Sequence, residues 1–266
     1  MTLLDADWIA RLRARAAQPP LQARDRLLLG TSGVEIGSID PVLAARIAAA
    51  GLPLEGGARG WRLTGPPDAS LARIAGWLDA NRVSSRWRGE LLGVIDPQGG
   101  KVAQVERSAS RALGLTTCAV HLVGRTAGGD VWVQQRAYDK STDPGLWDTL
   151  MGGLVTADES IADTLARETM EEAGLELKEL NDIRPCGRVT VRRPVVDGYM
   201  IEHIDVFEAL VPEGVVPANR DGEVERFERL GPAALLQRLQ AEAFTLEAAL
   251  VLVSWLQQRE APAPSP

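Results

Sequence analysis

The sequence predicts an α/β protein of the α+β type, built as two domains. Strand-like and helix-like runs alternate along the whole chain. The length of 266 residues suits one large domain or two modest ones. The charge also changes along the chain, because residues 1–115 hold 15 basic and 11 acidic residues whereas 116–266 hold 14 and 25. We therefore expect a smaller α+β domain of unassigned role over 1–115, a second domain over 116–260 and a disordered tail at 261–266.

The first domain reads as a series of short elements. Apolar residues share one face of a helix that Pro19 and Pro20 end. Asp40 and Pro41 are typical of a helix start, because Asp caps the helix and Pro suits its first turn. The expected elements are, in order, a helix over the first 17 residues, a hairpin at 26–39, helices at 42–50 and 70–81, a strand at 87–96 and a helix at 104–114.

The second domain begins near Leu115 with strand patterns. Alternating apolar residues predict strands, and the Gly-containing segment 126–130 predicts the turn between the first two. The expected elements are strands at 118–125 and 131–136, a helix after a loop, strands at 189–196 and 200–210, and helices at 232–240 and 245–258.

Composition excludes several classes of function. The net charge of -7 disfavours a nucleic-acid binder, and the longest apolar stretch is far too short to span a membrane. The N-terminus lacks the pattern of a secretory signal, and two Cys fit a reducing compartment, so we expect a cytoplasmic protein. Two His and two Cys lack zinc-ligand spacing. The abundant acids predict oxygen ligands, hence Mg²⁺ or Mn²⁺.

Residues 152–175 carry the strongest chemical signal. Glu168, Glu171 and Glu172 fall on one face of a predicted helix, where like charges repel. A divalent cation bound there relieves the repulsion and can bridge the phosphates of a substrate. Residues 158–160 are good helix-start residues, and Gly174 is a good stop.

This segment resembles the Nudix box, G-x5-E-x7-R-E-U-x-E-E-x-G-U, where U is apolar. The positions that match are Gly153, Glu159, Arg167, Glu168, Glu171, Glu172, Gly174 and Leu175. Thr169 departs from the usual aliphatic residue, and we expect its hydroxyl to bond a preceding carbonyl at little cost. The resemblance implies a Nudix α/β/α sandwich with a mixed sheet.

The resemblance also implies roles for individual residues. The glutamates 168, 171 and 172 look like the metal ligands, joined by the carbonyl of Gly152. Arg167 and Glu159 look like the ion pair that positions the helix. A later acid often serves as ligand or general base; Glu223 is the best match and Glu202 the second. The catalytic set is thus Glu171, Glu172, Glu223 and Arg167, with Glu171 or Glu223 preferred as proton acceptor.

Candidate substrate contacts lie on the loops and strands around the box. Arg136 and Lys140 match positions where the family branch carries Arg and Lys, and they are candidate phosphate contacts, although a solvated surface role is an alternative for both. Trp147, Tyr138 and Tyr199 offer stacking surfaces, and plain packing explains each of them equally well. Asp148 is a candidate loop-fixing acid, and His121 reads as a satisfied core histidine.

The wider sequence resembles the Nudix branch associated with thiamine pyrophosphokinase. Residues 131–175 and 205–228 carry the sharpest likeness, and residues before 110 resemble the N-terminal domain of that branch more loosely. The resemblance implies hydrolysis of a small-molecule diphosphate, with damaged thiamine diphosphates as substrates and a monophosphate plus phosphate as products. The alternatives are cleavage of oxidised nucleotides such as 8-oxo-dGTP, an isopentenyl-diphosphate-type isomerase, and a non-catalytic ligand-binding module. A homodimer is left open.

Overall fold

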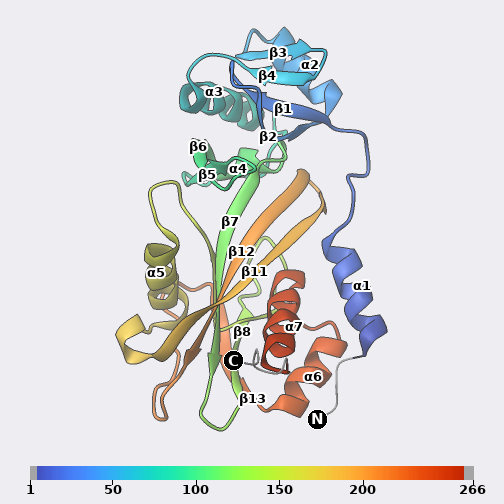
Figure 1. Ribbon diagram of the computed structural model, residues 1–266. Coiled ribbons are helices and arrows are strands. Elements are labelled where there is room, and N and C mark those ends of the chain that lie inside the picture. The colour runs from blue at the N-terminus through green and yellow to red at the C-terminus, as the bar shows by residue number, and fades with distance from the viewer. Residues whose placement is uncertain (1–4, 261–266) are drawn as a thin grey trace, which may run out of the picture.

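The computed structural model describes residues 5–260, which form an upper and a lower unit in the view of Figure 1. Four strands of the upper unit form a sheet in the order β2-β1-β4-β3, and β5 pairs with β6 in a separate hairpin. The elements of the upper unit are β1 (Asp25–Leu29), β2 (Val34–Ile39), α2 (Pro41–Ala49), β3 (Leu54–Gly57), β4 (Gly60–Leu63), α3 (Pro67–Ala80), β5 (Leu91–Ile95), β6 (Lys101–Glu106) and α4 (Arg107–Ser110). The predicted tail at 261–266 lies outside the described residues.

The upper unit largely follows the local signals of its sequence. The hairpin expected at 26–39 is confirmed by the antiparallel pair of β1 and β2. Helix α2 starts as predicted, with the Asp40 carboxylate accepting a hydrogen bond from the Leu43 amide at 2.8 Å. Leu71 and Ile74 on α3 are fully buried, and they pack in one core with α2 and the strands.

The helix expected at 104–114 is wrong in its first part. Residues up to Glu106 belong to strand β6, and only the four residues Arg107–Ser110 form the helix α4. Val105 of β6 pairs with Leu92 of β5 and is buried, so pairing across the hairpin overrides the helical pattern of the segment.

The lower unit is built on one seven-stranded mixed sheet. Five strands run in the order β11-β12-β7-β8-β13, with β10 beside β7 and β9 beside β8. Strands β7 and β12 are parallel, and the other pairs are antiparallel. The elements are β7 (Thr116–Arg125), β8 (Val131–Arg136), β9 (Trp147–Asp148), β10 (Met151–Leu154), α5 (Ile161–Ala173), a 3-10 turn (Leu177–Glu179), β11 (Asn181–Val195), β12 (Gly198–Leu210), β13 (Val224–Leu230), α6 (Pro232–Gln240) and α7 (Leu246–Glu260).

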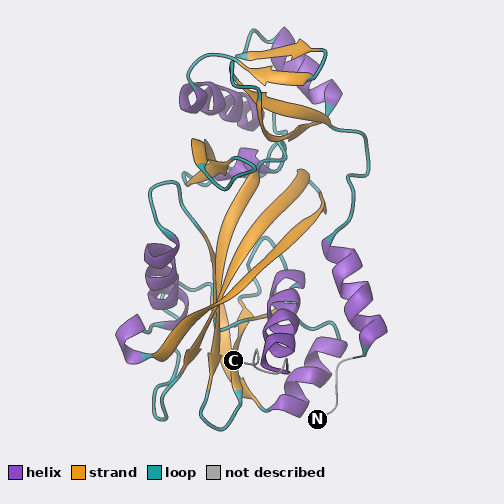
Figure 2. Cartoon of the chain, in the orientation of Figure 1, coloured by secondary structure: helices purple, strands orange, loops and turns teal. Residues whose placement is uncertain are grey.

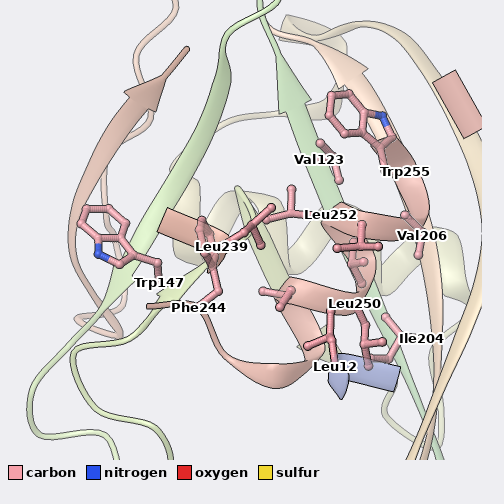
Figure 3. Close-up of a cluster of buried hydrophobic side chains, with 14 of the residues drawn as sticks. Leu12, Val123, Trp147, Ile204, Val206, Leu239, Phe244, Leu250, Leu252 and Trp255 are labelled. Atoms are coloured by element: carbon pink, nitrogen blue, oxygen red, sulfur yellow. The ribbon is translucent and has the colours of Figure 1, made fainter. Parts of the chain in front are cut away.

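Helices cover both faces of this sheet. Helix α5 lies on one face, and α6 and α7 lie on the other (Figures 1 and 2). Successive residues of β7 point to opposite faces: Val120 belongs to the core under α5, whereas Val123 belongs to the core under α7. Figure 3 shows Val123 in this second core with Leu252 and Trp255 of α7. Helix α5, which carries Glu168, Glu171 and Glu172, therefore lies against one face of the sheet.

Helix α1 (Ala6–Ala16) packs on the lower unit, which corrects its expected place in a domain of residues 1–115. Trp8 and Leu12 are buried in the same core as Ile204 and Leu250. Figure 3 shows Leu12 beside Ile204 and Leu250. The chain after the helix stays attached, because the Gln18 amide donates to the Arg192 carbonyl at 3.0 Å. An amphipathic pattern shows that one helix face must be covered, but it carries no information about the partner. Among residues 5–260 no helix is both long and apolar enough to cross a membrane.

Candidate active site

Helix α5 carries the box residues and is held at both ends. At its start, Ser160 and Asp163 form a capping box, with the Asp163 amide donating to the Ser160 hydroxyl at 3.2 Å. At its end, Gly174 adopts a left-handed conformation with φ of 64°. Both ends confirm the sequence expectation. Thr169 is buried and its hydroxyl donates to the Leu165 carbonyl at 2.6 Å, as expected for this departure from the motif.

Arg167 joins three carboxylates of the box. Its Nε and Nη2 donate to the two oxygens of Glu159 at 2.6 and 2.8 Å. Its Nη1 donates to Glu168 at 2.8 Å and to Glu171 at 2.9 Å. The hydrogen bond to Arg167 is the main reason that the pKa of Glu159 falls to about 2. Arg167 therefore ties the loop before α5 to the helix and lies among the predicted metal ligands.

Glu168 and Glu172 are removed from water. Burial raises the pKa of Glu168 to about 7, opposed by Arg167 and reinforced by the charges of Glu171 and Glu223. Glu172 is 3% exposed, and burial raises its pKa to about 8. One Glu172 oxygen accepts hydrogen bonds from the Gly152 amide at 3.0 Å and from Gln134 Nε2 at 2.8 Å.

The residues gathered here fit a divalent cation by donor chemistry. They offer three carboxylates and the backbone of Gly152, and oxygen donors of this kind suit Mg²⁺ and Mn²⁺. Gly153 leaves room for Glu168, because a Cβ at that position would lie 2.1 Å from its carboxyl carbon. Within residues 5–260 no three His, Cys, Asp or Glu side chains converge as a ready metal cage, since Glu168 and Glu171 share Arg167 instead. Their crowded, partly desolvated charge is what a cation would neutralise.

The late acid Glu223 comes close to the box. It directly precedes β13, its side chain pairs with Lys140, and its charge acts on Glu168. Burial alone would raise the pKa of Glu223, but the hydrogen bond and charge of Lys140, followed by other nearby cations, lower it. The second candidate, Glu202, lies on β12 beside Thr117, and burial raises its pKa to about 7.

The other predicted substrate contacts are engaged elsewhere. Arg136 donates to the Thr142 carbonyl at 3.0 and 3.3 Å and so orders the loop between β8 and β9. Trp147 is 7% exposed and lies in the α7-side core near Leu239 (Figure 3), with the Arg238 guanidinium 4.2 Å above its ring. The Tyr199 hydroxyl donates to the Gln18 carbonyl at 2.8 Å. For Trp147 and Tyr199 the described contacts match the packing alternative.

A buried polar network supports the strand that carries Gly152. His121 lies on β7, and a Cβ on Gly152 would come within 2.7 Å of its ring. Its Nδ1 is 3.0 Å from the Thr149 hydroxyl, and burial lowers its pKa. Asp148 accepts from the Thr149 amide at 2.8 Å, so it fixes the loop as expected. His121 is thus a satisfied core histidine.

Sequence reasoning missed two groups of residues near the box. Gln134 positions Glu172 and is buried, but it shares its face of β8 with Trp132 and Arg136, so the strand pattern did not mark it. The upper unit also reaches the loop that leads into α5: the Ala157 amide donates to the Leu91 carbonyl at 2.8 Å, and Lys101 Nζ donates to the Ala157 carbonyl at 2.6 Å. No local pattern in the sequence marks these contacts between distant segments. We call this contact region between the units, residues 85–92 and 101–107 against 137–146 and 155–157, the seam.

Comparison with known proteins identifies the family. Nudix hydrolase 24, chloroplastic, of Arabidopsis thaliana is 32% identical over 159 residues, which are 57% of this chain and 43% of that protein. Isopentenyl-diphosphate Delta-isomerase of Jannaschia sp. is 34% identical over 151 residues, 55% of this chain and 82% of the relative. The crystal structure of DR0079 from Deinococcus radiodurans shares the fold, with a TM-score of 0.50 and 24% identity over 62% of this chain and 97% of that one.

The chain spans only part of the first curated relatives that it matches, 42% to 57% of their lengths. A family model described as NUDIX domain matches residues 115–250, which is about half of the chain. These residues lie in the lower unit, whose helix α5 carries Arg167 and the glutamates 168, 171 and 172 of the box, with Glu159 just before the helix. The chain belongs to the NUDIX domain family, and its lower unit has the α+β Nudix fold.

Proposed function

We propose that this protein is a Nudix hydrolase, dependent on Mg²⁺ or Mn²⁺, that cleaves the diphosphate of a small molecule. We further propose thiamine-diphosphate-like compounds, including their damaged oxy and oxo forms, as the substrates. The products are then the monophosphate and phosphate. The observation that carries the first proposal is the complete set of Glu168, Glu171 and Glu172 on α5, with Glu223 beside it. The sequence resemblance to the thiamine-associated branch supports the second.

Different residues of the chain would bind the metal, accept the proton and position the carboxylates. Glu168, Glu171, Glu172 and the Gly152 carbonyl are the groups to hold the divalent cation, which when bound neutralises diphosphate charge and makes a water more acidic. The side chains of Glu171 and Glu223 are 45% and 50% exposed, so either can accept a proton from a water that attacks phosphorus. The bridging oxygen leaves with the other product. Arg167 and Gln134 position the carboxylates.

The metal-site proposal predicts a loss of turnover without a loss of fold. Glu171→Gln and Glu172→Gln each lower kcat at least tenfold, because a neutral amide is a poor ligand for Mg²⁺. The fold survives at Glu172, since glutamine keeps an oxygen that can accept from Gln134 and Gly152. Glu213→Gln, an exposed acid with no described partner within residues 5–260, is the control. Full Mg²⁺-dependent activity in both box variants would mean that the site is misplaced.

A substrate panel tests the thiamine assignment. Thiamine diphosphate, its oxy and oxo forms, 8-oxo-dGTP and 8-oxo-dGDP are assayed side by side with phosphate release as the readout. The highest kcat/KM is expected for a thiamine-diphosphate analogue. A clear nucleotide preference would replace this assignment with cleaning of oxidised nucleotides. Tight ligand binding with no turnover of any compound would instead support a non-catalytic module.

The isomerase relative makes isopentenyl diphosphate a necessary member of the panel. Burial raises the pKa of both cysteines, Cys118 and Cys186, which keeps the thiols protonated. Neither makes a described contact with the box glutamates. We therefore expect no double-bond migration in isopentenyl diphosphate, and proton NMR of the reaction mixture measures it.

A further inference from the structure

The cations of the lower unit that lie nearest the box are already engaged. Arg167 binds three glutamates, Arg136 donates to the Thr142 carbonyl, and Lys140 pairs with Glu223. A diphosphate brings several negative charges into this acidic site, where each needs a cation or a hydrogen-bond donor. Additional donors must come from another part of the molecule if the protein itself is to contact the phosphates.

Arg88 of the upper unit reaches the loop that holds Lys140. Its Nη2 donates to the Ser141 hydroxyl at 2.8 Å, and Ser141 directly follows Lys140. The Arg88 backbone amide donates to Glu106 Oε1 at 2.7 Å, which fixes the start of the side chain. Within the described part of the chain, Nε and Nη1 of Arg88 have no partner. The backbone and one end of the guanidinium of Arg88 are therefore fixed, and its Nε and Nη1 can donate to a ligand.

Arg107 of α4 lies close to Arg88, because it directly follows Glu106, whose side chain accepts from the Arg88 amide. Its Nη1 pairs with Glu90 at 2.7 Å, and its side chain remains 42% exposed. The Arg107 amide donates to the Glu90 carbonyl at 2.9 Å, so the start of this residue is also fixed. Arg88 and Arg107 are therefore held together at the seam by Glu90 and Glu106, beside the loop that holds Lys140.

The seam that carries these arginines is held together by several hydrogen bonds. Ala157 and Lys101 bond across it, and Leu92 forms a β-bridge with Thr156. On the far side, the Tyr199 amide donates to the Arg111 carbonyl at 2.9 Å. Glu106 is 2% exposed, and its Oε2 has no hydrogen-bond partner among the residues the structure describes. The upper unit is thereby held in a fixed position over the loop that precedes α5.

We propose that Arg88 and Arg107 form an anion subsite at the seam that binds phosphate oxygens of the substrate, so that the N-terminal unit completes the active site. A guanidinium suits this task, because its planar donors match phosphate oxygens in pairs. The subsite rests on the proposed diphosphate hydrolase function for its biological meaning. It also gives the N-terminal unit a role in substrate selection: compounds with a diphosphate are retained over those with a single phosphate.

Kinetics of the full-length chain test the subsite. Arg88→Gln and Arg107→Gln each raise KM for the best diphosphate substrate at least fivefold, and the double variant at least twentyfold, with kcat within threefold of wild type. Arg107→Lys restores part of the loss, because it keeps the charge without the paired donors. The control is Arg62→Gln, an exposed arginine on β4 of the same unit. An equal rise in KM for this control would overturn the proposal.

A binding measurement separates the subsite from the proposed hydrolysis. Inorganic pyrophosphate is titrated calorimetrically into each full-length variant without divalent metal, so that no turnover is needed. The double variant binds at least fivefold more weakly than wild type, while hydrogen exchange of the Ala157 amide shows that the seam is intact. Binding within twofold of wild type overturns the subsite. If no compound of the panel is hydrolysed, the functional proposal fails but this titration still decides the subsite.

Discussion

Arg167 shows how one side chain can order a whole site. Two of its nitrogens fix Glu159 in the loop before α5, and the third reaches Glu168 and Glu171 on the helix. The bidentate geometry makes the pair with Glu159 stronger than an ordinary surface ion pair. Loss of Glu159 therefore frees the loop and also releases a cation among the glutamates.

Replacement of Glu159 should change stability in a way that depends on pH. Arg167 holds the pKa of Glu159 at about 2, below its ordinary value of 4.5. A lowered pKa in the folded state stabilises the protein above the unfolded value, and this contribution is lost as the pH falls toward the folded value. Glu159→Gln thus lowers the free energy of unfolding by about 1–3 kcal/mol at pH 7.

Urea unfolding of wild type and variant at several pH values measures the difference. It should be constant between pH 7 and about 5 and shrink below about 4.5. Glu213→Gln, which removes an exposed acid, leaves the stability unchanged at each pH. A difference that grows on acidification would contradict the assignment of this pKa.

Gly153 sets the distance between α5 and β10. A methyl group there would lie 2.1 Å from the Glu168 carboxyl carbon, so Gly153→Ala must displace that carboxylate. We expect turnover to fall at least tenfold, with about 1–3 kcal/mol lost from the free energy of unfolding. In Gly76→Ala on α3, the new methyl group meets open space, and this variant should gain about 0.5–1 kcal/mol at full activity. Assays of turnover and urea unfolding on both proteins separate the clash from a general effect of alanine.

At the scale of elements, the end of α5 is tied to the loop that delivers Glu223. Gly174 has φ of +64°, and a Cβ there would lie 2.5 Å from the Ala218 carbonyl. The Ala218 amide donates to the Ala173 carbonyl at 2.8 Å, and the Arg220 amide donates to the Glu171 carbonyl at 3.1 Å. These hydrogen bonds join the end of the helix to the loop that leads to the late acid.

Two glycine variants test this coupling. Gly129→Ala in the turn between β7 and β8 has φ of +88° and open space, so it measures the backbone strain alone, about 1–2 kcal/mol. Gly174→Ala adds the contact with Ala218, and we expect a larger loss in urea unfolding together with reduced turnover. Equal losses of stability in the two variants, with full activity in both, would show that the loop adapts freely.

At the scale of the whole molecule, the first helix closes the fold against the last. Leu12 of α1 is 4% exposed in the core that α7 and β11 share. Leu12→Ala should lower the free energy of unfolding by about 2–5 kcal/mol. Arg11→Ala, one residue away and exposed, should change it by less than about 0.5 kcal/mol. Hydrogen exchange should locate the loss in α7 and β11, and an effect confined to the upper unit would contradict this packing.

Local patterns predicted the parts of this structure that depend on neighbours in sequence. The spacing of the box, the cap at Ser160, the stop at Gly174 and the hairpin at 26–39 are all short-range features, and each is confirmed. Contacts between distant segments were beyond such patterns. The position of α1 depends on its packing against the lower unit, and residues expected to be helical form β6 because they pair with β5.

The same limit applies to side chains around the box. Trp147 and Tyr199 were candidates because aromatic residues near a loop suit either stacking or packing, and sequence cannot separate the two. The sequence did not indicate Arg88 and Arg107 as site residues, because they lie outside the box in another unit and belong to no recognisable motif. The roles of the box residues remain predictions that the variants above test.

The packing of α1 on α7 has a consequence for how the chain is made. Residues 6–16 leave the ribosome before residues 246–260, which cover them and are translated more than 200 residues later. At about 5–20 residues per second, the apolar face of α1 waits on the order of ten seconds or more for its partner. During synthesis, Trp8 and Leu12 are therefore exposed to chaperones and to other nascent chains. The upper unit, whose core lies within residues 27–115, can be complete well before that helix is covered.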